Sequence, residues 1–374
     1  MTRFFCPGRT ELAGNHTDHQ KGRVMAAAVD KGITAEAELN GENVIRVFSQ
    51  GFEPVQVDLS RLWPEESDAG TSASLVRGMA AVLSETVTAL RGFDAYLVSD
   101  LTPGGGLSSS AAYSVLLGCI IAHFADGPDV SGEELARAAQ KAENRFFGKP
   151  CGLMDQMACA VGGSIYMDLL ENKLLHIDCG FERLGLTLCL TETGGSHAKA
   201  TEAYASIPAD MSAVAQVFGE AFLAKVRTAD FDAQWPSHTD DPKWMRARHF
   251  FDENWRVSAM ADALGLRDGQ RYIELMNESG RSSEQLLRNI ESPLAGPELA
   301  RGLALSALLL EGKGAWRVHG GGFAGCVQAL MPQEEFPAYQ AAMDAAFGEG
   351  SCQRIRIRSK GVGVLEDDSS PASP

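Results

Sequence analysis

The strongest constraint on the fold of this chain is a run of glycines and serines between two apolar segments, at residues 101–112 (LTPGGGLSSSAA). The segment before it, 93–99, alternates as a β-strand does, and the segment after it, to Phe124, has the apolar spacing of a helix. A glycine loop between a strand and a helix presents backbone N–H groups at the positive end of the helix dipole, which attracts phosphate. A flexible surface loop is the alternative, but disordered Gly/Ser linkers do not lead into such apolar runs. We therefore predict that phosphate is held by Gly104, Gly105, Gly106, Leu107, Ser108, Ser109 and Ser110.

Composition and charge narrow the class of protein. A length of 374 residues suggests about two domains, and 45% hydrophobic with 22% charged residues is typical of a globular protein. The formal net charge of −16, without a Lys- or Arg-rich run, argues against a nucleic-acid-binding surface. The eight cysteines have neither zinc-site nor disulfide-framework spacing. Because free thiols fit a reducing compartment and no run reaches about 18 apolar residues, we expect a cytoplasmic protein without a membrane span.

A second polar cluster lies near the N-terminus. Residues 10–20 (TELAGNHTDHQ) follow a Pro-Gly-Arg sequence that ends at Arg9, and they are denser in hydrogen-bonding side chains than a solvated loop requires. Arg9 can steady a phosphate or orient a carboxylate through two parallel hydrogen bonds. Asn15, His16 and Asp18 are side chains that can hold sugar hydroxyls, and a polar turn is the alternative. Metal ligation by the His-x-Asp-His pattern is the weaker interpretation, because third and fourth ligands are not evident.

Two acidic residues in the middle of the chain are further candidates. Ser131 and Glu134 have the spacing of a capping box, which predicts a helix from there to Phe147. Glu143, on this helix, is either a solvent-facing residue or a metal ligand. Asp155 follows in an otherwise apolar stretch, where an ionised carboxylate is costly without a partner, although a helix-capping role is the alternative.

The remaining pattern indicates mixed α and β structure. The region 211–310 is mostly helical in pattern. The polar tail 367–374 has a composition that is typical of disordered segments. Asn40-Gly41 predicts a type I′ hairpin between the second and third of four expected strands. These strands are expected at 24–29, 33–39, 44–48 and 55–59.

A glycine pattern near the C-terminal end matches the dinucleotide-binding fingerprint literally, as Gly320-x-Gly322-x-x-Gly325. The residues that follow, 326–330, read as a strand, whereas the fingerprint requires a helix there. A Rossmann domain is therefore not predicted.

Taken together, the motifs resemble those of the GHMP small-molecule kinases, and of the galactokinase branch in particular. Pro7-Gly8-Arg9 with Gly14-Asn15-His16-Thr17-Asp18 is similar to the galactokinase signature. The loop at 104–111 is similar to the family's ATP-phosphate loop, and residues 318–326 are similar to its third glycine motif. Residues 151–156 (CGLMDQ) match the segment that carries the catalytic aspartate. The order and spacing of these motifs cover nearly the whole chain.

The resemblance implies a fold and a reaction. The fold would be α+β with two domains, an S5-like GHMP kinase N-terminal domain over residues 1–185 and a ferredoxin-like C-terminal domain over 186–366, with the active site in the cleft between them. The reaction would transfer a phosphoryl group from ATP, with Mg²⁺, to the anomeric hydroxyl of galactose, forming galactose 1-phosphate. The expected partners are these small molecules, with neither nucleic acid nor membrane. Oligomeric state is not visible in the sequence, and a monomer is one possibility.

The resemblance also assigns roles to individual residues. Asp155 matches the catalytic aspartate and Arg9 its partner arginine. Ser110 and Glu143 match the Mg²⁺-binding serine and glutamate. The sugar-lining positions of the family are occupied here by Asn15, His16, Asp18, Gly152 and Tyr204.

Departures from the family pattern leave alternatives open. Asn15 stands where the family has a Glu that usually meets the C6 hydroxyl, and His19 stands where it has Tyr. A neutral amide would remove repulsion against a C6 carboxylate, so a galacturonate or other modified-hexose 1-kinase is the alternative. Ser72 and Leu75 replace an aromatic pair near adenine, which leaves the nucleotide base open. The segment before the first motif is shorter than is usual in the family, which indicates a trimmed or unusual start. An alternative of another class is a catalytically inactive sugar sensor, against which the intact Asp155 speaks.

Overall fold

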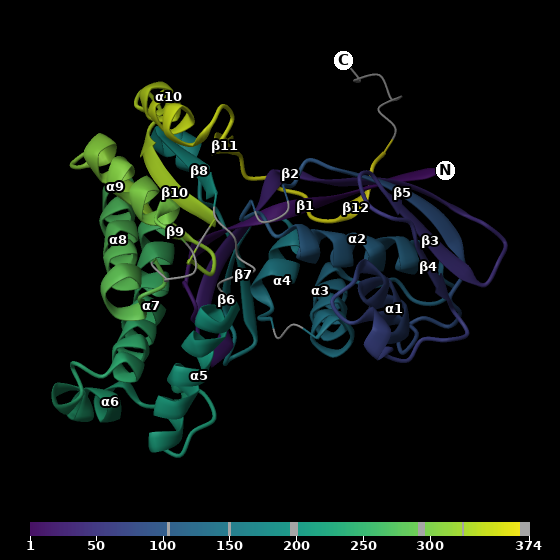
Figure 1. Cartoon of the computed structure of the whole chain (residues 1–374), viewed down its shortest axis with the longest axis horizontal. Coiled ribbons are helices and arrows are strands. Elements are labelled where there is room, and N and C mark those ends of the chain that lie inside the picture. The colour runs from purple at the N-terminus through teal and green to yellow at the C-terminus, as the bar shows by residue number, and fades with distance from the viewer. Residues whose placement is uncertain (103–104, 149–150, 195–200, 291–295, 324, 367–374) are drawn as a thin grey trace.

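The computed structural model describes residues 1–102, 105–148, 151–194, 201–290, 296–323 and 325–366. Their strands form two sheets, each with its own helices, and the two sets lie side by side along the longest axis of the molecule (Figure 1). The chain is therefore an α+β protein, as the sequence predicts.

The first sheet is built around two long neighbouring strands. β1 (Thr2–Ala13) pairs antiparallel with β2 (Arg23–Leu39), which continues through both of the strands expected at 24–29 and 33–39. Successive side chains of a strand point to opposite faces, and Ala26, Ala27 and Ala28 are all fully buried, so both faces of β2 are covered there. The strand order is β12 (Gly363–Val364), β1, β2, β5 (Phe93–Ser99), β3 (Val44–Ser49) and β4 (Val55–Asp58), and β2 also pairs with β6 (Ser164–Asp168), which pairs with β7 (Lys173–Ile177).

The predicted hairpin at Asn40-Gly41 is wrong. β5 lies between β2 and β3, antiparallel to the first and parallel to the second. The Asn40 side chain donates hydrogen bonds to the Val44 carbonyl at 3.0 Å and to Asp94 of β5 at 2.8 Å. The turn residues thus reverse the chain but leave room for an inserted strand. A local turn signal cannot show that a strand from about fifty residues later fills this space.

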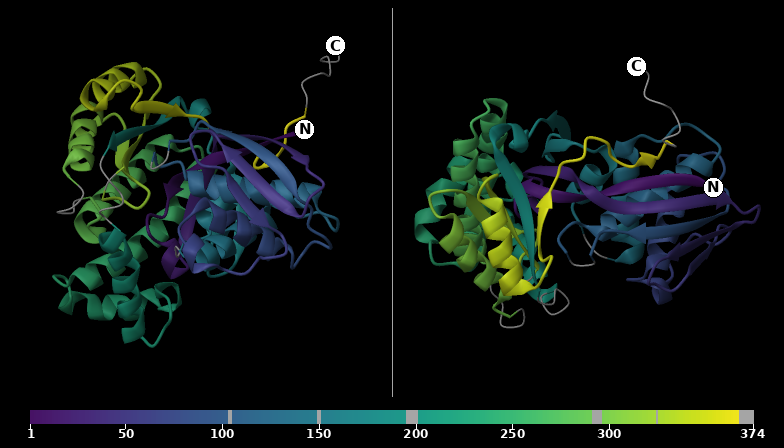
Figure 2. Two further views of the ribbon diagram at one scale, coloured as in Figure 1. Left: turned by 45° about the vertical axis from the view of Figure 1, so that its right-hand side comes forward. Right: turned by 90° about the horizontal axis from the view of Figure 1, so that it is seen from above.

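Helices cover one face of the first sheet: α1 (Ser72–Leu83), α2 (Ser109–Phe124), α3 (Gly132–Ala142) and α4 (Met154–Val161) (Figures 1 and 2). Helix α2 is central, and its Leu116, Leu117 and Ile120 are completely buried. The predicted capping box is confirmed at the start of α3, where Ser131 and Glu134 each accept a hydrogen bond from the other's backbone. The helical path then continues through a π-helical turn, Glu143–Phe147.

The second sheet has the strand order β11 (Cys352–Ile355), β8 (Leu186–Gly194), β10 (Gly325–Pro332), β9 (Ala315–His319), all antiparallel. In chain order this is the 4-1-3-2 arrangement of a ferredoxin-like βαββαβ unit. The residues after Gly325 form a strand, so the glycine pattern does not begin a nucleotide-binding helix. The helices of this set are α5 (Thr201–Val217), α6 (Thr228–Gln234), α7 (Pro242–Gly265), α8 (Gly269–Ser282), α9 (Glu298–Leu310) and α10 (Phe336–Phe347). Over the described ranges, no helix combines the length and apolar character needed to cross a bilayer.

Buried polar contacts join the two sets. Arg317 of β9 places Nη1 2.8 Å from Oε1 of Glu11 on β1, and both residues are buried. Burial raises the pKa of Glu11, and the Arg317 charge opposes that rise. At the C-terminal end, β12 returns to pair with β1 of the first sheet. The domain boundary at residue 185 stays a prediction, and the tail 367–374 lies outside the described residues.

We expect Arg317→Met to lower the free energy of unfolding by about 3–5 kcal/mol, because it leaves the Glu11 carboxylate buried without its cation. Urea unfolding followed by circular dichroism measures this loss. The matched control is Arg183→Met, which removes an ion pair with Asp178 whose side chains are 65% and 75% exposed. That control should lose about 1 kcal/mol or less. Equal losses in the two variants would contradict the prediction.

Candidate active site

The centre of the site is an ion pair between Arg9 of the first motif and Asp155 at the start of α4. Arg9, near the end of β1, meets Asp155, in the first turn of α4, through two parallel hydrogen bonds: Nε to Oδ1 and Nη2 to Oδ2, each 2.7 Å. The Arg9 side chain is 8% exposed and that of Asp155 31%. Burial by itself would lower the pKa of Arg9, but the charge of Asp155 and its hydrogen bonds together raise it above its ordinary value. Asp155 therefore faces a cation and does not simply cap its helix.

The glycine-rich loop adjoins this pair. The Gly106 carbonyl accepts a hydrogen bond from Arg9 Nη1 at 2.6 Å, and the Ser108 hydroxyl donates to Asp155 Oδ2. Ser108 has a left-handed backbone (φ 55°) and its side chain does not cap α2. The first-turn N–H groups of α2, which begins at Ser109, are therefore left without a side-chain cap. Gly104 lies outside the described residues; of the rest of the predicted loop, Gly106 and Leu107 contact Arg9, and Ser108 contacts Asp155.

A cavity beside the ion pair is lined by all seven residues that the sequence predicts for catalysis and sugar binding. The seven are Arg9, Asn15, His16, Asp18, Gly152, Asp155 and Tyr204. The other lining residues include Glu11, His19 and Cys151, with Gly320 and Gly321 of the third glycine motif. Residues from the first sheet, from α4 and α5, and from the turn after β9 of the second sheet thus converge on one cavity.

Two glycines allow this convergence. A Cβ on Gly152 would lie 1.8 Å from Oδ2 of Asp18, so only glycine lets this carboxylate occupy its place. A Cβ on Gly321 would lie 2.4 Å from the ring of Tyr204, which approaches from α5. The Tyr204 hydroxyl lies 3.1 Å from Nε2 of His19. The sugar signature, the third glycine motif and α5 are therefore packed so closely that side chains of one segment contact the glycine backbone of another.

His16 lines the cavity and is held as a neutral imidazole. Its Nε2 lies 3.0 Å from the Gly321 carbonyl, which can only accept, so Nε2 carries the proton. Burial, followed by the charge of His19, lowers the pKa of His16 to about 3, so the ring is neutral at pH 7. Nδ1 is then a bare acceptor, and it has no hydrogen-bond partner in the part of the chain that the structure describes.

Asn15 is placed differently from the sugar-contacting role that the sequence predicts. Although it borders the cavity, it is completely buried, and its amide Nδ2 donates to the Gly320 carbonyl at 2.6 Å. Its Oδ1 accepts from Asn289 Nδ2 at 2.9 Å. His249 of α7 donates to the Asn15 carbonyl at 2.9 Å, which fixes the backbone as well. The amide therefore joins the first motif to the second half of the chain.

The predicted metal residues also lie together. Ser110 Oγ, in the first turn of α2, is 3.4 Å from Oε1 of Glu143, and Glu143 is buried, so the solvent-facing alternative is wrong. Gln156 donates to its other oxygen at 2.8 Å. A hydroxyl and a carboxylate oxygen suit Mg²⁺, which takes few protein ligands beside substrate phosphates. Among the described residues, His, Cys, Asp and Glu side chains form no group of three or more that could hold a metal ion on their own.

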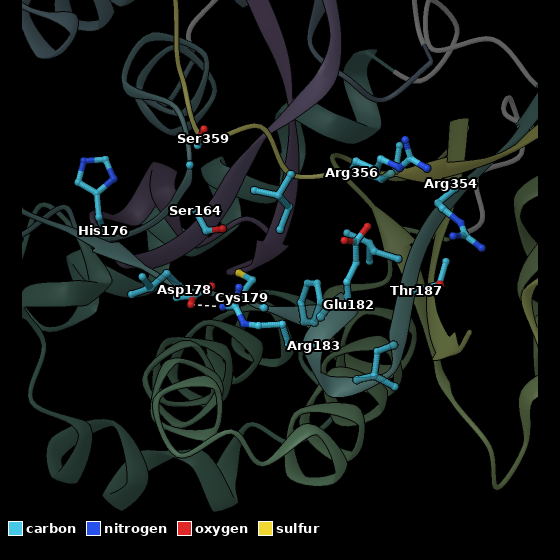
Figure 3. A pocket seen from close by; sticks show the side chains of 18 residues that line it. Ser164, His176, Asp178, Cys179, Glu182, Arg183, Thr187, Arg354, Arg356 and Ser359 are labelled. Atoms are coloured by element: carbon cyan, nitrogen blue, oxygen red, sulfur yellow. Dashed lines mark hydrogen bonds and ion pairs between the residues drawn. The ribbon is translucent and has the colours of Figure 1, made fainter. Parts of the chain in front are cut away.

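A larger cavity, of about 570 Å³, lies between β6–β7 and the β8–β11 edge (Figure 3). Its lining residues are all different from those around Arg9 and Asp155. Figure 3 shows that Arg183 is already paired with Asp178 and that Glu182 stands among its side chains. The cavity at Arg9 and Asp155 is therefore the candidate active site.

Sequence reasoning missed several buried residues around the site. Glu11 is two residues from Arg9 on the same strand and hence on the same face, so its spacing could have indicated it. Asn15 is held by His249 of α7 and by Asn289, which follows the helical turn ending at Leu287, and both lie more than 230 residues away. Their sequence surroundings contain no signal that could have found them.

Comparisons with known proteins agree with this geometry. Residues 56–163 match the family described as GHMP kinases N terminal domain, and residues 2–38 match the galactokinase galactose-binding signature. A galactokinase of Actinobacillus pleuropneumoniae serotype 3 is 30% identical over 335 residues, which are 88% of this chain and 85% of that protein. A galactokinase of Glaesserella parasuis is 29% identical over 338 residues, or 89% and 86% of the two chains.

Solved structures show the same fold. Lactococcus lactis galactokinase, complexed with galactose, matches with a TM-score of 0.84 at 24% identity, covering 97% of this chain and 95% of that one. A mevalonate kinase from Methanococcus jannaschii matches with a TM-score of 0.68 at 16% identity, covering 95% and 98%.

We expect Gly152→Ala to weaken the binding of galactose, the predicted sugar, by at least about tenfold, because the new Cβ displaces the Asp18 carboxylate. Isothermal titration calorimetry measures this change. The control is Gly265→Ala at the end of α7, where a Cβ meets open space and binding should be unaltered. Unchanged galactose affinity in a folded Gly152→Ala variant would contradict the placement of Asp18 in the sugar site.

Proposed function

The chain belongs to the galactokinase family of the GHMP kinases, and from this premise we propose that it transfers the γ-phosphoryl group of ATP to the anomeric hydroxyl of galactose. The observation that carries the proposal is the Arg9–Asp155 pair, which borders the sugar cavity on one side and the glycine loop on the other. A hydroxyl in the cavity and a phosphate on the loop can thus meet at a single carboxylate.

Asp155 orients the nucleophile. Its carboxylate accepts a hydrogen bond from the anomeric hydroxyl, while Arg9 keeps it ionised. A carboxylate held by two hydrogen bonds from a guanidinium is a weak base, so the hydroxyl proton passes to it late, as the bond to phosphorus forms. Phosphoryl transfer has a loose transition state that requires little early deprotonation, and it depends mainly on positioning and charge stabilisation.

The phosphates of ATP bind to the loop and to the start of α2. The uncapped first-turn N–H groups and the helix dipole attract the anion in a chain whose overall charge is −16. Ser108 donates a hydrogen bond to Asp155 and so links the phosphate loop to the carboxylate. A movement of the loop therefore also moves the carboxylate. Arg9 supplies the nearby positive charge that balances the transferring group.

Ser110 and Glu143 would hold Mg²⁺ beside these phosphates, since their oxygens lie together and one is a buried carboxylate. The ion, when bound, supplies charge neutralisation for the β- and γ-phosphates. Gln156 and Cys151 contact the other Glu143 oxygen and keep the carboxylate turned toward Ser110. We further propose that the protein works in the cytoplasm, where its eight free thiols stay reduced.

The charges around the cavity favour a neutral hexose. Glu11, Asp18 and Asp155 are carboxylates on its lining. Arg317 and Arg9 neutralise the first and the last, so Asp18 is the carboxylate here that has no arginine or lysine partner among the described residues. The neutral His16 adds no positive charge to the lining. A C6 carboxylate would meet repulsion here, and the Asn15 amide is engaged within the protein. These observations favour galactose over galacturonate.

We expect Asp155→Asn to reduce sugar phosphorylation by about 10²–10⁴-fold, because the amide no longer accepts the hydroxyl proton. ADP release in the presence of galactose measures turnover, and calorimetry should still detect nucleotide binding. Asp178→Asn, in the separate larger cavity, is the control and should keep full activity. Loss of nucleotide binding in Asp155→Asn would give Asp155 a structural role, and a wild-type protein that binds galactose but releases no ADP would be a sensor.

We expect the wild-type enzyme to prefer galactose to galacturonate by at least about tenfold in kcat/KM, because like charges in a desolvated site cost several kcal/mol. Initial rates with each sugar at saturating ATP and Mg²⁺ measure the ratio. A wild-type comparison is preferable to Asn15→Glu, which would also remove the hydrogen bond that the Asn15 amide donates to the Gly320 carbonyl. A preference for galacturonate would contradict the charge argument.

A further inference from the structure

A buried imidazole nitrogen beside the phosphate loop has no hydrogen-bond partner. His319 ends β9 and is 3% exposed. Its Nδ1 is inaccessible to solvent and is unpartnered with respect to every residue that the structure describes. Most buried polar atoms in proteins are hydrogen-bonded, so such an atom requires an explanation.

The other ring nitrogen determines which tautomer is present. The Glu11 backbone N–H donates to His319 Nε2 at 3.2 Å, so Nε2 is an acceptor. The Thr10 hydroxyl lies 3.0 Å from the same nitrogen and itself accepts from Gln328 Nε2 at 2.9 Å, which leaves its hydrogen for His319. Burial and the charges of Arg9 and Arg317 lower the pKa of His319 and keep the ring neutral. A neutral imidazole that accepts at Nε2 carries its proton at Nδ1.

This N–H lies against the phosphate loop. A Cβ on Gly106 would be 3.0 Å from His319 Nδ1. Because glycine has no Cβ, this nitrogen can lie close to the loop backbone. The Gly106 carbonyl binds Arg9, which in turn holds Asp155. The unpartnered donor is therefore next to the part of the loop that adjoins the transfer centre.

We propose that His319 binds the γ-phosphate of the nucleotide through its Nδ1–H, which the loop backbone at Gly106 covers in this structure and uncovers when the nucleotide binds. This inference rests on the proposed function, because it takes the loop at Gly106 as the place where ATP presents the group to be transferred. The second half of the chain would then contribute a direct contact to the transferring group. Because the ring is neutral, it adds a directed hydrogen bond without a further charge, and the contacts from Thr10 and Glu11 keep the donor oriented.

Two substitutions separate this role from a structural one. In His319→Gln the longer side chain reaches the position of Nε2, so its amide oxygen can still accept from Thr10 and Glu11, but the donor at Nδ1 is lost. In His319→Asn the amide nitrogen replaces Nδ1, but the acceptor at Nε2 is lost. The first variant should keep its thermal stability, and the second should be less stable.

Calorimetry on the full chain then compares the Mg²⁺ complex of a non-hydrolysable ATP analogue with that of ADP, which lacks the γ-phosphate. We expect His319→Gln to bind the analogue about 10–100-fold more weakly than the wild type while its ADP and galactose affinities stay unchanged. His319→Asn should retain the wild-type ratio of analogue to ADP affinity. An unaltered ratio in His319→Gln would overturn the proposal, as would an equal loss for both nucleotides.

A measurement on the wild type guards against a variant that does not fold. In ¹⁵N-histidine-labelled protein, the Nδ1–H signal of His319 should shift with the ATP analogue and much less with ADP. A signal insensitive to the analogue would overturn the proposal. These binding measurements need no turnover, so a protein that shows them without phosphorylating a sugar would refute the proposed function and leave the His319 contact standing.

Discussion

The site depends on the two parallel hydrogen bonds between Arg9 and Asp155. They join the end of β1 to the first turn of α4, and the remaining Arg9 nitrogen holds the glycine loop at Gly106. A single guanidinium thus sets the distance between the carboxylate that we propose to receive a hydroxyl and the loop that we propose to receive a phosphate. An arginine suits this task because its planar fork fixes direction as well as charge, which a lysine would not do.

Buried groups next to this pair hold it in place and determine the charge and polarity of its surroundings. Glu11 and Arg317 form a buried ion pair between the first and second sheets, so the cavity floor is shared by both halves of the chain. A buried pair contributes little net stability compared with apolar packing, but it is costly to break, and it therefore favours one relative placement of the two sheets. The same low-dielectric surroundings keep His16 neutral and make each donor or acceptor at the site count for more than it would in water.

Features that follow from neighbouring residues could be predicted from the sequence. The strand at 93–99, the helix after Ser108 and the capping box at Ser131 were correct, because local propensity and spacing decide them. The glycine pattern at Gly320 was correctly separated from a nucleotide-binding fold, since a strand follows it. The hairpin predicted at Asn40-Gly41 was wrong because β5 lies between the two strands and pairs with both. The turn residues carry no information about the pairing of a strand that comes later in the chain.

The sequence by itself determined that this chain belongs with the GHMP kinases and predicted which short motifs carry its chemistry, because those motifs are contiguous and their order is specific. Only the tertiary structure decided how the polar atoms are paired. It turned the Ser108 hydroxyl to Asp155, enclosed the Asn15 amide among distant residues and left His319 with a proton on Nδ1. The physical reason is that a buried hydrogen bond depends on which groups long-range packing brings within about 3 Å of each other, and separation along the chain says nothing about that.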